Sequence, residues 1–267
     1  MTTAICITGM HRSGTSLTAS WLERCGLVIH DGSLIAPAAG NRLGHFEDRE
    51  FVVLHAAALD EQGLGGSMGW KASSAAAVTF PPARRAEAEE LVRRRDAKFP
   101  VWGWKDPRSV LFLDEWKAIV PELKVLFVWR PAVDVVESLV RRSRRTRNPD
   151  MKARTLAAPG LWKVYNQRLL DYRRRHPSST VLIPFSALVD ADRQVLELVE
   201  RRFDVQLPYR PLADLYDEGL RRHRPVSVSR SVSGLAASLT GCAAVERDLQ
   251  EASDSPLGTT PPPALRP

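Results

Sequence analysis

Residues 9–16 have the sequence Gly9-Met10-His11-Arg12-Ser13-Gly14-Thr15-Ser16, and they directly follow a short apolar run, residues 3–8. The apolar run is typical of a buried strand. The segment after the loop, 15–25, carries Trp21 and Leu22 at a spacing that predicts a helix with one buried face. A strand, a glycine-bounded loop and a helix form an anion-binding nest, because the loop amides and the helix N-terminus point at one phosphate.

The loop has the glycine spacing of a Walker A loop without its lysine. That motif is G-x-x-x-x-G-K-[ST], and its lysine reaches the β- and γ-phosphates of a triphosphate. Thr15 occupies the lysine position here, and the cation lies inside the loop at Arg12. We therefore expect a loop that holds a 5′-phosphate and lacks the triphosphate clamp of an ATPase or GTPase. The simpler alternative is a turn with an incidental arginine, because short motifs often match by accident.

The composition is that of a globular protein with excess positive charge. The chain has 267 residues, which suffice for one large α/β domain or two small ones, and a formal net charge of +7. The charge favours an anionic ligand but does not choose between a polyanionic cofactor, an acidic acceptor and nucleic acid. Three scattered cysteines predict a reducing compartment and no structural zinc. With no signal peptide or spanning segment expected, we predict a cytoplasmic protein.

Strand-like and helix-like segments alternate along the chain. This alternation predicts an α/β protein with a central, mostly parallel sheet flanked by helices. The expected strands are 3–8, 101–104, 124–129 and 180–184. The expected helices are 15–25, 49–59, 82–98, 111–119, 131–142, 159–175 and 192–203, of which the charged helix 82–98 is expected to be a solvated surface helix. Residues 1–225 are expected to form one domain, and the Ser- and Pro-rich segment 226–267 to be partly disordered.

Arg130 and Ser138 form a second candidate anion site. Arg130 follows the clearest buried strand, and Ser138 lies about two turns into the next helix. Ligands bind at the carboxyl ends of strands in open α/β sheets, where an arginine and a hydroxyl together hold a phosphate well. The alternative is an arginine that caps the helix and an unrelated surface serine.

In three segments the chain resembles the sulfotransferases that use 3′-phosphoadenosine 5′-phosphosulfate (PAPS). Residues 9–16 resemble the loop that binds the 5′-phosphosulfate, in the G-x-x-R-S-G-T-[ST] form of tyrosylprotein-type and many bacterial members. Residues 125–138 resemble the 3′-phosphate motif, in which an arginine and a serine eight positions later bind that phosphate. Residues 104–108, Trp-Lys-Asp-Pro-Arg, resemble a segment whose lysine faces the transferred group.

The resemblance implies a P-loop-NTPase-like sulfotransferase fold and transfer of a sulfuryl group from PAPS to a hydroxyl of a small-molecule or carbohydrate acceptor. Adenosine 3′,5′-bisphosphate (PAP) would be the product, and no metal is required. The residues that it assigns to the donor are His11, Arg12, Ser13, Gly14, Thr15, Ser16, Arg130 and Ser138. The chain departs from the family pattern in having Pro131-Ala132 after Arg130, and no Arg-Lys-Gly loop is found. The likeness is therefore closer to the tyrosylprotein and bacterial type than to the cytosolic phenol and steroid type.

An acceptor hydroxyl needs a base to take its proton as the sulfuryl group arrives. The resemblance points to Glu47 as this base. His45 is a second candidate because the cytosolic enzymes use a histidine, and Asp48 and Asp106 stay open. The resemblance also implies that Arg12 and Lys105 stabilise charge on the departing PAP, much as cationic clamps do in phosphoryl transfer. The alternative for Glu47 is a solvated acid at a helix N-terminus.

Two other classes of function compete with this interpretation. A P-loop kinase or another nucleotide-binding phosphotransferase is disfavoured by Thr15 and by the lack of a clear acidic metal ligand at a strand end. A nucleic-acid-binding protein is disfavoured because the arginines are not interleaved with aromatic residues. We therefore expect neither a nucleic acid nor a membrane as partner, and the sequence leaves the identity of the acceptor and the oligomeric state open.

Overall fold

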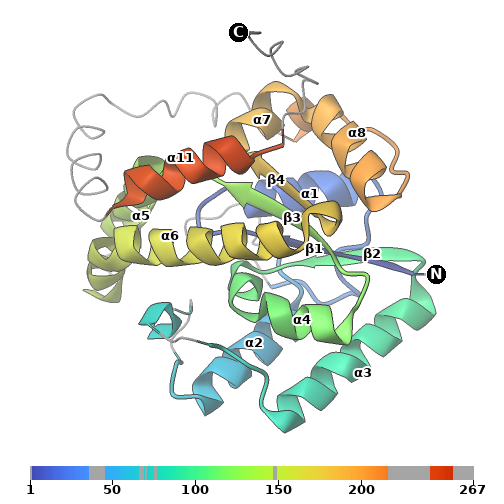
Figure 1. Ribbon diagram of the computed structural model, residues 1–267, viewed down its shortest axis with the longest axis horizontal. Coiled ribbons are helices and arrows are strands. Elements are labelled where there is room, and N and C mark those ends of the chain that lie inside the picture. Colours follow the sequence, from blue (N-terminus) through green and yellow to red (C-terminus); the bar gives the residue numbers. More distant parts are fainter. Residues whose placement is uncertain are drawn as a thin grey trace, which may run out of the picture.

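The computed structural model describes residues 2–35, 46–65, 69, 71–74, 77–146, 149–215 and 241–254 (Figure 1). Its centre is a four-stranded sheet in the order β2-β1-β3-β4, in which every neighbouring pair is parallel. The strands are β1 (Thr3–Thr8), β2 (Val101–Lys105), β3 (Lys124–Trp129) and β4 (Thr180–Pro184). The α/β architecture and the parallel sheet expected from the sequence are confirmed.

The strands are apolar because helices cover both faces of the sheet. Alternate residues of one strand face opposite sides, so Cys6 belongs to one hydrophobic core and Ile5 and Ile7 belong to the other. Both central strands, β1 and β3, are buried along their whole length except at the first residue.

Two groups of helices cover the two faces (Figure 1). On the Ile5 side lie α1 (Thr15–Arg24), α7 (Phe185–Asp190) and α8 (Asp192–Phe203). On the Cys6 side lie α2 (Arg49–Glu61), α3 (Pro82–Lys98), α4 (Leu113–Ile119), α5 (Ala132–Thr146), α6 (Pro149–Arg175) and α11 (Cys242–Ala252). Short 3₁₀ segments are η1 (Lys71–Ser74), η2 (Pro107–Phe112), η3 (Pro177–Ser179) and η4 (Leu212–Asp214). Among the residues described, no helix combines the length and the apolar character that crossing a membrane requires.

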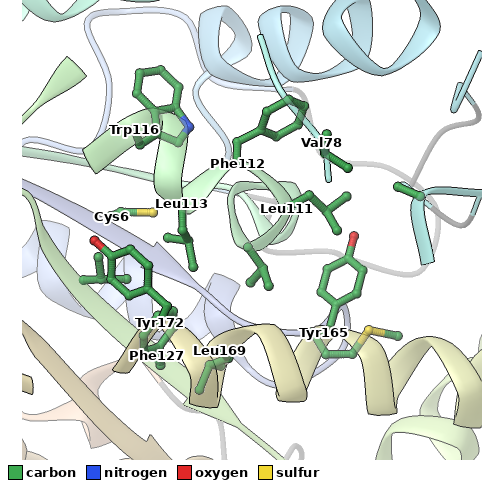
Figure 2. Packing of buried hydrophobic residues seen from close by; sticks show 14 of the residues in the cluster. Cys6, Val78, Leu111, Phe112, Leu113, Trp116, Phe127, Tyr165, Leu169 and Tyr172 are labelled. Carbon is green, nitrogen blue, oxygen red and sulfur yellow. The ribbon is translucent and has the colours of Figure 1, made fainter. Parts of the chain in front are cut away.

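Aromatic side chains fill the core on the Cys6 side. Phe51 stacks on Trp104 with ring centroids 4.6 Å apart, and Trp116 packs against Trp104 at 5.0 Å. Figure 2 shows the adjoining part of this core, where Tyr165 and Tyr172 of α6 face η2 and α4. The strand that ends at Lys105 is therefore anchored by the large buried rings that pack on Trp104.

The helices differ from expectation in the middle of the chain. Helix α6 begins at Pro149 and continues through Pro159, where the sequence predicted a helix start. A proline is favoured at a first helical position, which made Pro159 an attractive start. Inside a helix it removes one backbone hydrogen bond and crowds the preceding turn, and α6 nevertheless continues through Pro159. Residues 107–112 form η2, so the α-helix expected from 111 begins at Leu113. Helices α7 and α11 were not expected.

The C-terminal part of the described chain returns to the sheet. Helix α11 runs alongside α6, and the thiol of Cys242 donates to the Pro159 carbonyl at 3.4 Å (Figure 1). Asp254 then meets the outer side of β4, where its backbone N–H donates to the Leu182 carbonyl and its carboxylate accepts from the Leu182 N–H. Helix α11 belongs to the expected segment 226–267, whose boundary at residue 225 lies outside the described residues and stays a prediction.

Replacing Trp104 by alanine is expected to lower the free energy of unfolding by about 3–5 kcal/mol, because it removes a fully buried indole and leaves a cavity. Urea denaturation followed by circular dichroism measures the change. Val53→Ala is the control, since Val53 is 55% exposed and its loss should change stability by no more than about 0.5 kcal/mol. If the two variants lose similar stability, the aromatic cluster does not carry the fold.

Candidate active site

The loop between β1 and α1 is held against the ends of two other strands. A Cβ atom at Gly9 would lie 2.1 Å from the carbonyl oxygen of Val128 in β3. A Cβ atom at Gly14 would lie 2.1 Å from the ring of Phe185, which follows β4. Both glycines also have positive φ angles, 152° and 98°. The loop can cross the carboxyl ends of the strands this closely only because both positions lack a side chain.

Arg12 joins this loop to the second predicted anion site. Its φ angle of 72° is unusual for a residue other than glycine, and such conformations cluster at ligand-binding sites. Its Nε donates a hydrogen bond of 2.9 Å to Oγ of Ser138, which lies on α5 and is buried. The fold therefore brings together two residues that the sequence separates by 126 positions.

The loop offers further groups that fit a phosphate. The Oγ atom of Ser13 is buried and, among the described residues, has no hydrogen-bond partner. Thr15 and Ser16 form the first turn of α1, where the backbone N–H groups lack partners within the helix. A phosphate oxygen would satisfy these donors and also interact with the positive end of the helix dipole. His11 is mostly buried and packs on Tyr165, with ring centroids 5.9 Å apart.

Arg130 lies where β3 ends, next to the same loop. Its guanidinium is 5.5 Å from the centroid of the Phe185 ring, which also covers Gly14. Its Nε is 3.4 Å from Oδ2 of Asp134, and its backbone carbonyl accepts a 2.9 Å hydrogen bond from Nε1 of Trp162. The side chain is one quarter exposed. Arg130 is thus fixed through its backbone while its guanidinium can reach a ligand.

Glu47 and Lys105 form an ion pair near the ends of β1 and β2. Lys105 is the last residue of β2 and is 2% exposed, and its Nζ lies 2.7 Å from Oε1 of Glu47. Glu47 directly precedes Asp48, the N-cap of α2, and its side chain is only 13% exposed. The pair brings together two residues that the sequence predicted to act in catalysis. At 13% exposure, Glu47 is not a solvated helix-terminal acid.

Asp106 is the centre of a buried network that borders this pair. Its carboxylate accepts hydrogen bonds from the backbone N–H and Nε of Arg108, both at 2.9 Å. Nδ1 of His55 lies 2.8 Å from Oδ2 of Asp106, and Nε1 of Trp116 donates to Nε2 of His55 at 2.8 Å. Since Nε2 accepts, the proton of a neutral His55 lies on Nδ1 and is donated to Asp106. Arg108 Nη2 is 3.9 Å from Oε2 of Glu47, so the network extends to the candidate base.

The charges of this network fix its protonation states. Burial lowers the pKa of His55, so the ring stays neutral. Burial disfavours the charged form of Asp106, but the Arg108 guanidinium and the His55 hydrogen bond outweigh it and hold the pKa of that carboxyl far below its usual range. Asp106 is therefore a permanent counter-ion for Arg108, which argues against it as the base.

The remaining two candidates for the base are Asp48 and His45. Asp48 is buried; its Oδ1 accepts from the Glu50 N–H at 2.9 Å and its Oδ2 from Arg95 at 2.6 Å. Both of its oxygens thus have structural partners. His45 lies outside the described residues.

Sequence reasoning did not single out His55 or Arg95. His55 lies on the buried face of α2 among Phe51, Leu54 and Ala58, and a polar residue on an apolar helical face was the signal that could have found it. Arg95 carried no such signal, because it is one of several arginines in a helix that looked solvated.

The chain is similar to known proteins in sequence and in fold. The sequence model described as Sulfotransferase family matches residues 4–209. Two similar solved structures are a sulfotransferase domain from the curacin biosynthetic pathway (TM-score 0.50, 19% identity, covering 86% of this chain and 83% of that one) and a sulfotransferase from Alicyclobacillus acidocaldarius (TM-score 0.52, 13% identity, covering 94% and 99%). At these identities the likeness shows a shared fold. No curated protein matches this chain significantly.

Neutral, buried His55 predicts a specific pH dependence of stability. The pKa of His55 in the folded protein lies below its value of about 6.5 in the unfolded chain. The stabilisation of the fold by the neutral ring is therefore complete above about pH 6.5. It is lost below that pH, because the unfolded chain then takes up a proton that the folded protein does not bind. Between pH 7.5 and 5.5 the wild type should lose more free energy of unfolding than His55→Asn, which keeps an amide donor for Asp106. Urea denaturation at both pH values measures this, and equal losses would mean that His55 is protonated in the fold.

Proposed function

The chain belongs to the sulfotransferase family, and on this premise we propose that it transfers a sulfuryl group from PAPS to a hydroxyl of a small-molecule or carbohydrate acceptor. Sulfuryl transfer in general follows from the family. The donor, the acceptor class and the roles of individual residues are our proposal. The form of the loop at residues 9–16 supports kinship with the tyrosylprotein and bacterial type.

One observation carries the choice of donor: the 2.9 Å hydrogen bond between Arg12 and Ser138. Arg12 is assigned to the 5′-phosphosulfate and Ser138, with Arg130, to the 3′-phosphate. PAPS carries both groups on a single ribose, so its binding site needs two anion cradles side by side. A nucleoside triphosphate instead carries its phosphates in one row, and a P-loop kinase binds them with the Walker lysine. This chain has Thr15 in the position of that lysine. The contact therefore supports PAPS over the substrate of a P-loop kinase.

The donor would be held mainly by the loop and by α5. The loop amides, the first turn of α1 and the Ser13 hydroxyl, which has no partner within the part of the chain that the structure describes, suit the 5′ end. His11, Gly14, Thr15 and Ser16 are the neighbouring loop and helix positions. Arg130 and Ser138 suit the 3′-phosphate, since a charged guanidinium and a hydroxyl supply complementary donors.

The chemistry that we propose is an in-line displacement. The acceptor oxygen attacks sulfur and forms an O–S bond while the bond from sulfur to the bridging phosphate oxygen breaks, and PAP leaves. Glu47 takes the proton of the acceptor hydroxyl. Lys105 and Arg12 stabilise the charge that develops on the bridging oxygen. The 2.7 Å contact between Glu47 and Lys105 supports these roles, because it keeps the base and one cation beside the same reaction centre. The scheme needs no metal.

The proposed location is the cytoplasm. The cysteines at positions 6, 25 and 242 are all free and buried, which suits a reducing compartment.

Nucleotide binding tests the two-cradle proposal. In calorimetric titrations PAP should bind at least about 10-fold more tightly than 5′-AMP, because charge-assisted hydrogen bonds to the 3′-phosphate contribute about 1.5–3 kcal/mol. Arg130→Ala and Ser138→Ala should reduce this preference, whereas Arg174→Gln, which alters an exposed ion pair, should not. Equal affinity of the wild type for both nucleotides, or tighter binding of magnesium-ATP, would favour a phosphotransferase.

Turnover of ³⁵S-labelled PAPS tests the catalytic roles. A panel of 4-nitrophenol, N-acetylglucosamine and a simple aliphatic alcohol represents the acceptor classes. Arg12→Ala and Lys105→Ala should each slow transfer by roughly 10²–10³-fold, the loss seen when one donor of a transition-state charge is deleted. Glu47→Gln should do the same, and His45→Ala tests the second candidate base. Folded Arg12→Ala and Lys105→Ala proteins with full turnover would remove the assignment.

A further inference from the structure

The backbone at Glu47 is held on one side by a short antiparallel bridge. Leu34 and Asp48 are bridge partners, the Ile35 N–H donates to the Glu47 carbonyl at 2.9 Å, and the Arg49 N–H donates to the Ser33 carbonyl at 2.8 Å. Glu47 thus lies between this bridge and the first turn of α2. Its side-chain direction depends on how firmly the start of α2 is held.

A buried charge pair fixes the start of α2. Nη2 of Arg95, on α3, donates to Oδ2 of Asp48 at 2.6 Å and to Oε2 of Glu50 at 2.7 Å. The side chains of Arg95 and Asp48 are 3% and 0% exposed. The other Asp48 oxygen, Oδ1, caps α2 through the Glu50 N–H. The carboxylate of Asp48, the residue that directly follows Glu47, therefore connects α3 to the start of α2.

A gain in the stability of the fold does not by itself explain why this ion pair is buried. Burying two charges costs much of what their attraction supplies, and apolar residues of similar volume often stabilise a fold as well or better. The Arg95 Nε atom is buried and has no hydrogen-bond partner among the described residues, which adds to the cost. What an ion pair provides and an apolar contact does not is a fixed direction. Here that direction is imposed one residue away from the proposed base.

We propose that Arg95 and Asp48 form a positioning pair that holds Glu47 within reach of Lys105 and of the acceptor hydroxyl. This inference rests on the proposed role of Glu47 as the base. Arg95 contacts Asp48 and Glu50, and it would act through Asp48 on the backbone that carries Glu47. The pair should therefore affect proton transfer and leave binding of the nucleotide unchanged, because the cradles at Arg12 and Arg130 belong to other elements.

The test compares Asp48→Asn and Arg95→Gln with a matched control on the same helix. Asparagine caps helices about as well as aspartate, so Asp48→Asn keeps the cap and loses the charge. Arg94→Gln is the control, because Arg94 also pairs with Glu50 but its side chain is 46% exposed. Turnover of ³⁵S-labelled PAPS is measured with a simple aliphatic alcohol and with N-acetylglucosamine, whose hydroxyls keep their protons at neutral pH, and is divided by the number of PAP-binding sites from calorimetry. Hydrogen–deuterium exchange reports the protection of the Ile35 and Glu50 amides.

Both positioning variants should lose about 10- to 100-fold in kcat per binding site, the size of effect that a small misplacement of a reacting group produces. Their PAP affinity should stay within about 2-fold of the wild type, a change of less than 1 kcal/mol. Protection of the Ile35 amide should fall in both variants and stay unchanged in Arg94→Gln, whereas Asp48→Asn should keep the Glu50 amide protected because the cap is retained. The double variant should lose no more than either single variant, because both break one interaction.

Three outcomes would overturn the inference. Unchanged protection of the Ile35 amide in both variants would show that the pair does not hold this backbone. A loss of activity that disappears after division by PAP-binding sites would indicate a purely structural role. Wild-type kcat in both variants, with Glu47→Gln inactive, would overturn the positioning pair alone. Full turnover in Glu47→Gln would instead remove the base, and the proposed function would fail at that residue.

Discussion

The carbonyl oxygen of Val128 leaves no room for a side chain at Gly9, and this constraint shapes the rest of the site. A loop that passes so close to β3 must cross the carboxyl ends of the parallel strands, where α1 begins and where Arg130 emerges. That route lets Arg12 reach Ser138 on α5. The sheet therefore determines the distance between the two proposed anion cradles, which come from distant parts of the chain. A side chain at Gly9 would push the loop away from β3 and so change that distance, even though it would not contact the ligand itself.

The other half of the site depends on balanced charge. Glu47 and Asp106 carry negative charge, Lys105 and Arg108 carry positive charge, and each is at least mostly buried. Such a group is stable only when every member keeps its partner, since a single uncompensated charge in the interior is costly. His55 adds a neutral hydrogen bond that orients Asp106 without disturbing the balance. The proposed reaction centre therefore keeps its geometry without a ligand, and it should tolerate few substitutions.

Much of the fold could be predicted because its signals are local. The strands at 3–8, 124–129 and 180–184 and the helices at 82–98 and 192–203 have the bounds that their apolar or charged patterns predicted. The contacts that build the site are not local: Glu47 and Lys105 are 58 positions apart, and only the family resemblance brought them into one hypothesis. The prediction that helix 82–98 is solvated is correct for most of its residues, but it did not anticipate that Arg95 is buried. Composition cannot show which of several arginines turns inward to meet a carboxylate from another helix.

The return of the chain to β4 at Asp254 has a practical consequence. β4 is the edge of the sheet, and an uncovered edge strand is a template for pairing with another molecule. The family match stops at residue 209, so a shortened protein designed from that boundary would lack Asp254 and leave Leu182 with an open N–H and an open carbonyl. A fragment of this kind invites self-association in concentrated solution. Expression work on this enzyme should keep the tail through residue 254.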